Sequence, residues 1–365
     1  MSTKVRSYSK INLGLAIGPV RPDGFHGLTT LYQTLELHDL VTVEAVRLPD
    51  GKPSRFSIAC NHAQVPTDSR NTAWSMAERA LAVLNISAEV HIDIDKRLPV
   101  QGGLGAGSAN AAAALIGLER ELGLALSGPE RLALAEGIGS DVPLFLVGGS
   151  VLGVSRGEEV YPLPDLPSYE CVVAVPEVSV STPQAFRDWD ALVADEPTSQ
   201  KRDVGHPAEQ GRIPFKPNDG LNGAPGGNLT GASLSGSLRR LSRSLASSLS
   251  MPHSSGVSPQ RGDLAENPLL ALVRTGIEND FERVVFPQYP LLGNIKRILA
   301  VPDPEAPEQS ALYAALSGSG SAIFGLYATT EAAKSAQQRL GDLGIKAHRT
   351  WTLPRVEYWR DMVSA

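Results

Sequence analysis

The chain has 365 residues, of which 42% are hydrophobic and 20% charged, and its formal net charge is −6. This length suggests two domains, and the composition is typical of a globular protein with a sizeable core. The mildly acidic balance excludes a general binder of nucleic acids or anionic membranes, because such proteins need clustered Lys and Arg side chains. A small anionic substrate is not excluded, because a few local cations are enough to bind one.

Cysteine, histidine and apolar patterns exclude further classes of protein. Cys60 and Cys171 lie far apart in the chain, so no disulfide scaffold or thiolate zinc site is expected, and a reducing cytoplasm is the expected compartment. The seven histidines show no metal-binding motif. The apolar run over 11–20 is interrupted by Asn12 and no cleavage site follows it, so we do not expect a signal peptide. No apolar run approaches the ~20 residues of a membrane span.

Apolar patterns along the chain predict alternating strands and helices. Alternation of apolar and polar residues predicts strands over 5–17, 28–44, 89–94, 151–160, 169–175 and 322–327. Apolar positions at helical spacing predict helices over 72–84, 109–122, 129–137, 269–285, 291–299 and 331–340. The stretch over 197–261 is dense in Ser, Gly, Pro, Asn and Arg and is predicted to be a loosely held insertion, with at most a weak helix over 234–249. The pattern indicates an α+β or α/β fold.

A glycine-rich loop lies between the predicted strand over 89–94 and an alanine-rich helix. Its glycines allow positive φ angles and close approach of a ligand, and the following helix start favours an anion such as a phosphate. Ser108 adds a hydroxyl placed for a phosphate or its Mg²⁺. The candidate phosphate-binding residues of this loop are Pro99, Val100, Gln101, Gly102, Gly103, Leu104, Gly105, Ala106, Gly107, Ser108 and Ala109.

Three other interpretations compete for this loop. A Walker A loop ends in Gly-Lys-Ser/Thr, whereas Gly107 is followed by Ser108 and Ala109. A dinucleotide fingerprint needs an acidic residue at a strand end about 20 positions later, whereas Glu119 and Glu121 lie on the predicted helix. A glycine turn without a ligand remains open, because the loop by itself is only a moderate signal.

Three segments in the right order carry a resemblance to a known family. They are Ser9-Lys-Ile-Asn-Leu13, the loop from Pro99 to Ala109, and Leu316-Ser-Gly-Ser-Gly-Ser-Ala322 before a C-terminal strand. Together they resemble the GHMP kinase superfamily. The resemblance implies a two-domain α+β fold, with a ribosomal protein S5 domain 2-like N-terminal domain over 1–165 and a ferredoxin-like C-terminal domain over 166–365, interrupted by the insertion.

Four further stretches narrow the resemblance. They are Arg21–Leu28, Gly139–Phe145, Thr182–Phe186 and Asn279–Glu282. They resemble the branch of the superfamily that phosphorylates the 2-hydroxyl of 4-diphosphocytidyl-2-C-methyl-D-erythritol with ATP, a step of non-mevalonate isoprenoid synthesis. The resemblance covers nearly the whole chain except the insertion.

The resemblance also implies roles for individual residues. Lys10 and Asp141 match its catalytic pair, with Asp141 as a base or orienting group for the hydroxyl. ATP and Mg²⁺ are the implied cofactors, and no protein ligand of the metal is assigned apart from a role open to Ser108. The remaining candidate positions are, for the substrate, Asn12, Phe25, His26, Thr182 and Phe186; for ATP, Asn71 and Lys96; and for a phosphate loop of the second domain, Ser317, Gly318, Ser319 and Gly320.

The sequence departs from the family pattern at three positions, and some alternatives stay open. Ala109 stands where the family has a second Ser, Phe25 where it often has Tyr, and Gln101 where Gly is common. Taken alone, Asp141 would fit an N-cap with Pro143 just inside the helix. A kinase for another alcohol, or a nucleotide-binding regulator without activity, remain as alternatives. The expected partner is a small molecule, with no nucleic acid or membrane, and the chain is expected to act as a monomer or homodimer.

Overall fold

The computed structural model describes residues 2–100, 102–195, 277–300 and 310–364. The insertion predicted over 197–261, the weak helix over 234–249 and Gln101 lie outside the described residues. In the part of the chain that the structure describes, no helix is long and apolar enough to cross a membrane.

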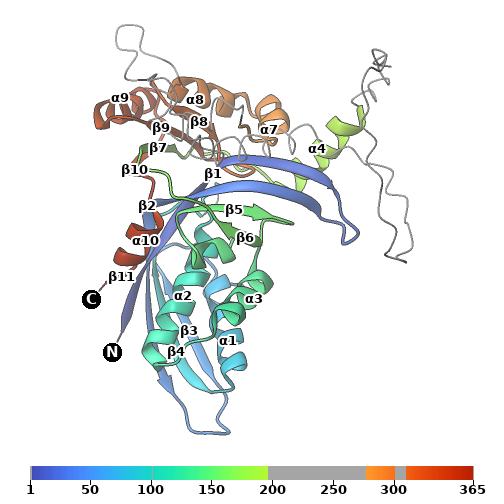
Figure 1. Cartoon of the computed structure of the whole chain (residues 1–365). Helices are drawn as coiled ribbons and strands as arrows, with labels where there is room; N and C mark the ends of the chain where they lie inside the picture. Colours follow the sequence, from blue (N-terminus) through green and yellow to red (C-terminus); the bar gives the residue numbers. More distant parts are fainter. Residues whose placement is uncertain (1, 101, 196–276, 301–309, 365) are drawn as a thin grey trace, which may run out of the picture.

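Two sheets with helices packed on them make up the fold (Figure 1). The strands are β1 (Thr3–Val20), β2 (His26–Arg47), β3 (Arg55–Cys60), β4 (Ala88–Asp95), β5 (Ser150–Val154), β6 (Glu159–Pro162), β7 (Glu170–Ala174), β8 (Tyr313–Leu316), β9 (Ile323–Tyr327), β10 (Ala347–Trp351) and β11 (Val363–Ser364). The helices are α1 (Thr72–Leu84), α2 (Ala106–Leu122), α3 (Gly128–Ile138), a 3₁₀ turn η1 (Pro143–Leu146), α4 (Thr182–Asp195), α7 (Glu282–Gln288), α8 (Pro290–Ala300), α9 (Thr330–Gly341) and α10 (Arg355–Asp361).

The first sheet has seven strands in the order β11-β1-β2-β4-β3, with β5 beside β2 and β6 beside β5. Helices α1 and α2 cover one of its faces, and α3 packs on α1 (Figure 1). The small side chains of α2 allow a close approach to the sheet. A Cβ atom on Gly117 would lie 2.6 Å from Cγ2 of Val43, so only glycine fits where the helix crosses the strand. This packing holds the second half of α2 close to β2.

The second sheet is antiparallel with the strand order β10-β7-β9-β8, and α8 and α9 pack on it. Numbered within this sheet, the order is 4-1-3-2, which is that of a ferredoxin-like fold. The predicted boundary at residue 165 falls between β6 and β7, where the chain passes from the first sheet to the second. After β10 the chain returns, and β11 pairs with β1.

A separate hydrophobic core joins the two sheets. Ile11 and Leu13 of β1 and Leu31 and Leu35 of β2 pack against the second sheet, represented by the buried Phe324. Because β1 takes part in both halves, the position of its side chains relative to the second sheet is fixed by apolar packing.

Most predicted elements are confirmed, and two differ in an instructive way. The strand predicted over 151–160 is two strands, because Ser155, with φ 69°, and Gly157, with φ 102°, turn the chain between β5 and β6. For the helix predicted over 269–285, residues 269–276 lie outside the described residues, and among the described ones helix α7 begins at Glu282. The prediction is wrong over 277–281, because Asn279 forms a bridge with Leu15 instead of a helical turn.

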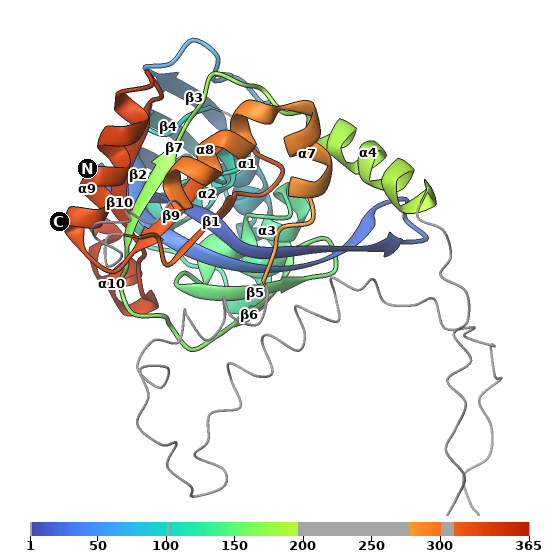
Figure 2. The same ribbon diagram turned by 90° about the horizontal axis from the view of Figure 1, so that it is seen from above.

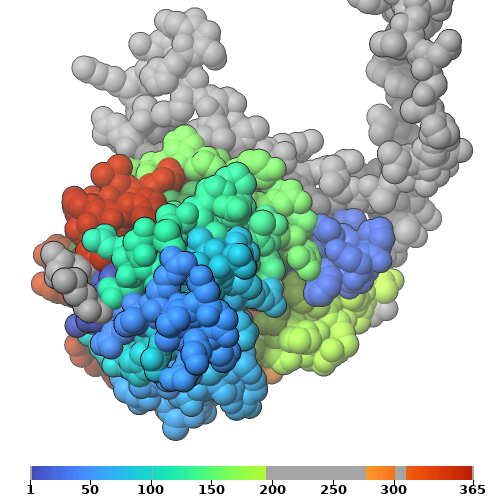
Figure 3. Space-filling model, turned by 90° about the horizontal axis from the view of Figure 1, so that it is seen from below, coloured from blue at the N-terminus to red at the C-terminus, as the bar shows by residue number. Residues whose placement is uncertain are grey.

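The β1–β2 ribbon reaches beyond the first sheet toward α4. Seen from above, its tip lies beside α4 (Figure 2). The space-filling view from below shows the same neighbours, with the blue tip of the ribbon against the yellow-green α4 (Figure 3). His26 on the ribbon and Phe186 on α4 stack with ring centroids 5.0 Å apart and planes 8° apart. Two segments predicted to bind substrate therefore meet here.

Candidate active site

The glycine loop places the start of α2 beside Lys10 of β1. Gly105 caps α2 with a φ of 72°, and the Lys10 N–H donates to the Leu104 carbonyl over 3.0 Å. A Cβ atom on Gly105 would lie 2.8 Å from Phe145 and 3.1 Å from Cγ of Lys10. Glycine is needed here both for its backbone angle and for space. The first N–H groups of α2 have no intrahelical acceptor and, with the helix dipole, favour an anion.

Lys10 and Asp141, predicted from the sequence as a pair, lie together beside this loop. The Lys10 ammonium is 3.2 Å from Oδ2 of Asp141 and donates to Oδ1 of Asn12 over 2.7 Å. The Lys10 side chain is 3% exposed and that of Asp141 is 31% exposed, so the carboxylate remains within reach of a ligand. The N-cap alternative for Asp141 is wrong, because Val142 occupies that position and no side chain caps η1.

Tyr32 is a member of this cluster that was not predicted from the sequence. Its hydroxyl donates to Oδ1 of Asp141 over 3.0 Å, and the Lys10 ammonium lies 5.6 Å from the centre of its ring. Burial, and then the neighbouring Asp141 carboxylate, raise the pKa of Tyr32 well above its usual range. The phenol therefore stays protonated and remains a hydrogen-bond donor at any physiological pH.

The loop over Ser317–Gly320 closes on the first glycine loop from the second sheet. The Ser317 hydroxyl donates to the Gly103 carbonyl over 2.9 Å. A Cβ atom on Gly103 would collide with the Ser317 carbonyl, and one on Gly318 would lie 3.7 Å from Nζ of Lys10. The Ser319 hydroxyl is 2.6 Å from that of Thr182 at the start of α4. The two loops predicted to contact phosphate are thus neighbours, with Lys10 beside both.

Asn279 holds this second loop and was likewise not predicted as a site residue. Its side-chain amide donates to the carbonyls of Leu316 and Gly318, each over 2.8 Å, and it is 2% exposed. Its carbonyl accepts from the Phe281 N–H over 3.0 Å. The sequence signal was its place in a matched stretch, which by itself does not separate a binding residue from a supporting one.

Two of the predicted substrate residues, Phe25 and His26, lie at the tip of the ribbon, whereas Asn12 lies beside Lys10. Phe25 is 56% exposed, with the Arg156 guanidinium 5.2 Å from the centre of its ring. His26 is nearly buried, and its two ring nitrogens lie 3.1 Å from the Gly18 carbonyl and 3.2 Å from Oδ1 of Asp190. An accessible aromatic ring beside a fixed histidine is suited to a planar base.

Asn71 and Lys96, predicted to line the ATP site, make structural contacts. Asn71 is the N-cap of α1, where its Oδ1 accepts from the Ala73 N–H over 2.9 Å. The Lys96 ammonium donates to Oδ2 of Asp39 over 2.6 Å, and these two side chains are 4% and 0% exposed. Both side chains have partners within the fold, and their role toward ATP stays a prediction.

Replacing Lys96 with methionine is expected to lower the free energy of unfolding by about 3 kcal/mol, because it leaves the Asp39 carboxylate buried without its cation. Urea unfolding measures this change. Lys296→Met is the matched control, because Lys296 pairs with Glu282 at 2.5 Å but is 32% exposed, and its loss should stay below about 1 kcal/mol. Equal losses in the two variants would contradict the buried-pair explanation.

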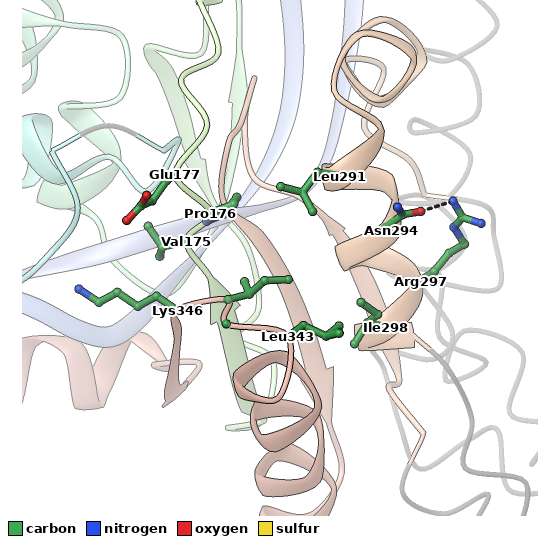
Figure 4. Close-up of a pocket in the computed structure, with 11 residues that line it drawn as sticks. Val175, Pro176, Glu177, Leu291, Asn294, Arg297, Ile298, Leu343 and Lys346 are labelled. Atoms are coloured by element: carbon green, nitrogen blue, oxygen red, sulfur yellow. Dashed lines mark hydrogen bonds between the residues drawn. The ribbon is translucent and has the colours of Figure 1, made fainter.

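A pocket of about 770 Å³ lies elsewhere, between α8 and the turn that precedes β10. Its walls include Leu291, Ile298 and Leu343, with Arg297 at the rim hydrogen bonded to Asn294 (Figure 4). None of the residues predicted from the sequence lines this pocket, so the candidate active site is the cluster around Lys10.

Two models of known protein families match this chain. A model described as the GHMP kinases N terminal domain matches residues 71–149, and one described as GHMP kinases C terminal matches residues 263–346. The first match includes the glycine loop, α2 and Asp141, and the second includes the Ser317–Gly320 loop. The fold is therefore that of a GHMP kinase.

Individual relatives narrow the family to which the chain belongs. A 4-diphosphocytidyl-2-C-methyl-D-erythritol kinase of Solibacter usitatus is 32% identical over 93% of this chain and 85% of its own length. One of Rhodococcus jostii is 42% identical, with the match spanning 52% of this chain and 60% of the relative. The chain belongs to the family of 4-diphosphocytidyl-2-C-methyl-D-erythritol kinases within the GHMP kinases.

Solved structures share the fold. A crystal structure of 4-(cytidine 5'-diphospho)-2C-methyl-D-erythritol kinase matches with a TM-score of 0.62 at 24% identity, covering 96% of this chain and 98% of that one. A homoserine kinase from Cytophaga hutchinsonii matches with a TM-score of 0.61 at 19% identity, covering 97% and 95%. The two similar scores show that the fold alone does not select the acceptor alcohol.

Proposed function

We propose that this protein transfers the γ-phosphoryl group of ATP to the tertiary 2-hydroxyl of 4-diphosphocytidyl-2-C-methyl-D-erythritol. The observation that carries the proposal is the Lys10–Asp141 pair lying beside both glycine loops. Catalysis of phosphoryl transfer to an alcohol is mostly positioning and charge stabilisation. It needs a group that orients or deprotonates the hydroxyl, a cation, and backbone N–H groups that bind the phosphates.

The mechanism assigns one role to each group. The triphosphate lies at the start of α2, between that helix and the Ser317–Gly320 loop. Asp141 accepts a hydrogen bond from the acceptor hydroxyl and receives its proton as the oxygen attacks the γ-phosphorus. The new O–P bond forms while the bond from phosphorus to the β-bridging oxygen breaks, and ADP leaves. Lys10 keeps Asp141 oriented and offers positive charge to the transferring group.

Mg²⁺ belongs to the proposal as a companion of ATP, and it neutralises phosphate charge when bound. Among the described residues, no group of three or more His, Cys, Asp or Glu side chains could hold a metal ion by itself. Ser108, in the first turn of α2 and partly exposed, is the residue whose hydroxyl fits a role beside the phosphates. The phosphates themselves would then supply most of the oxygen ligands.

The length of the site supports a long acceptor. Tyr32, which contacts Asp141, and His26 at the tip are six residues apart on one strand, which corresponds to roughly 20 Å. An acceptor whose hydroxyl reaches Asp141 and whose base reaches Phe25 and His26 must be extended, as a nucleoside diphosphate carrying a polyol is. A short alcohol would leave the ribbon tip and α4 without a role.

An ADP-release assay with Mg²⁺, ATP and a panel of alcohols tests this function. The panel contains the cytidine-diphosphate substrate, homoserine, mevalonate and the free polyol. We expect turnover with the first and little with the others. Turnover with a different alcohol alone would replace the proposed acceptor, and ATP binding without any turnover would favour a regulator that has lost catalysis.

A further inference from the structure

We propose that Tyr32 is a positioning residue for the catalytic carboxylate: its hydroxyl holds Oδ1 of Asp141 so that Oδ2 meets Lys10 and the remaining lone pairs face the acceptor. This inference rests on the proposed function, because it concerns the same phosphoryl transfer. It assigns a role to a residue that the sequence shows only as an aromatic position in an apolar strand.

Both carboxylate oxygens of Asp141 have a partner, and the two partners come from different strands. Tyr32 on β2 donates to Oδ1 over 3.0 Å, and Lys10 on β1 lies 3.2 Å from Oδ2. Asn12 pairs directly with Tyr32 across the two strands, so the three side chains share one face of the ribbon. A carboxylate held at both oxygens loses its rotation about χ2, and a group pre-oriented in this way lowers the entropic part of the barrier.

The Tyr32 hydroxyl is itself confined by glycines from the neighbouring segment. A Cβ atom on Gly153 would lie 2.5 Å from ring atom Cε2, and one on Gly157 would lie 2.6 Å from the hydroxyl oxygen. Gly153 belongs to β5, which pairs with β2, and Gly157 to the turn after it. The ring is 2% exposed. The two glycines therefore leave just enough space for the Tyr32 ring and its hydroxyl, so the hydroxyl has little freedom to move away from Asp141.

Charge around the hydroxyl keeps it a donor. Asp141 and Glu158 are the anionic groups that act on Tyr32, and both oppose its ionisation, as does burial. The Lys10 ammonium lies 5.6 Å from the centre of the ring. A hydrogen bond to a charged acceptor is stronger than one between neutral groups, so Tyr32 has a firmer hold on Asp141 than it would have on a neutral amide.

Steady-state kinetics of Tyr32→Phe test the proposal. We expect kcat to fall about tenfold while KM for ATP and for the acceptor stays within twofold, because the proposed task of the hydroxyl is to orient the base and not to bind a substrate. Tyr327→Phe is the matched control: its hydroxyl is also buried and donates to a carbonyl, that of Leu299, over 2.9 Å, but it lies in the second sheet. Thermal unfolding of both variants reports the common cost of losing a buried hydroxyl.

A double-mutant cycle with Asp141→Ala decides whether Tyr32 acts through Asp141. In the Asp141→Ala background, Tyr32→Phe should change the residual kcat by less than twofold. A tenfold loss in that background, or wild-type kcat in Tyr32→Phe alone, would overturn the inference. If Tyr32→Phe does not fold, Tyr32→Met fills the space without a hydroxyl and takes its place. Absence of turnover in the wild-type protein would instead count against the proposed function.

Discussion

Lys10→Met is expected to lower kcat by about 100- to 1,000-fold, the range seen when one preorganised electrostatic contact to a reacting group is lost. The side chain is nearly buried, and its ammonium has two partners, Asp141 and Asn12. Methionine keeps most of the volume of the stem that packs beside Gly105. It removes the positive charge next to both glycine loops, so the loss should appear in kcat more than in protein stability.

The control for this variant is the same substitution at an exposed position. Lys346 lies on the surface of the C-terminal half, at the edge of the pocket in Figure 4. Lys346→Met should have wild-type kcat and thermal stability. If Lys10→Met kept more than half of the wild-type kcat, Lys10 would be a structural lysine and its assigned role would be lost.

The elements best predicted from the sequence are those whose own residues determine them. Helix α1 occurs at the predicted bounds because Asn71 caps its start and Asn85, with a φ of 53°, ends it. Strand β4 alternates buried and exposed residues along nearly its whole length. These are local patterns, and a single sequence is enough to show them.

The parts that were not predicted depend on contacts distant in sequence. β1 carries the buried polar side chains Ser9 and Asn12, each of which donates a hydrogen bond to a residue of β2 that cannot be identified from β1 alone. Asn279 lies in a segment that was predicted to be helical, yet it bridges to β1 and supports the second loop. α4, at the ribbon tip, was recognised only as a matched stretch.

In the candidate site, too, residues in local motifs were predicted, and a residue whose partner is distant in sequence was not. Lys10 and Asp141 were identified from motifs, and the structure places them in contact. Tyr32 was not, because an aromatic residue in an apolar alternation is usually a core residue, and its partner Asp141 is 109 positions away. The sequence also did not show that the ammonium of Lys96 pairs with the buried Asp39, because Asp39 is distant in the chain. The predicted role of Lys96 toward ATP stays a prediction.

Asp141→Asn is expected to lower kcat by about 100- to 10,000-fold, the usual contribution of a general base. Asparagine has nearly the same shape, and its oxygen can still accept from Tyr32. It has no negative charge to receive the proton of the acceptor hydroxyl or to balance Lys10. KM for ATP should change little, because the N–H groups of the glycine loop and α2 are untouched. Steady-state kinetics on both substrates measure the two effects separately.

The thermal stability of Asp141→Asn and the size of its loss in kcat together distinguish the possible roles of Asp141. The carboxylate is about a third exposed, so the Lys10–Asp141 pair should contribute about 1 kcal/mol or less to folding, and the melting temperature of Asp141→Asn should stay close to that of the wild type. A fall in kcat toward 10,000-fold indicates that Asp141 takes the proton as the O–P bond forms. A fall of about tenfold indicates that it mainly orients the hydroxyl, which fits a loose transition state that needs little base catalysis. Wild-type kcat in this variant would contradict both roles and remove the central residue of the proposed site.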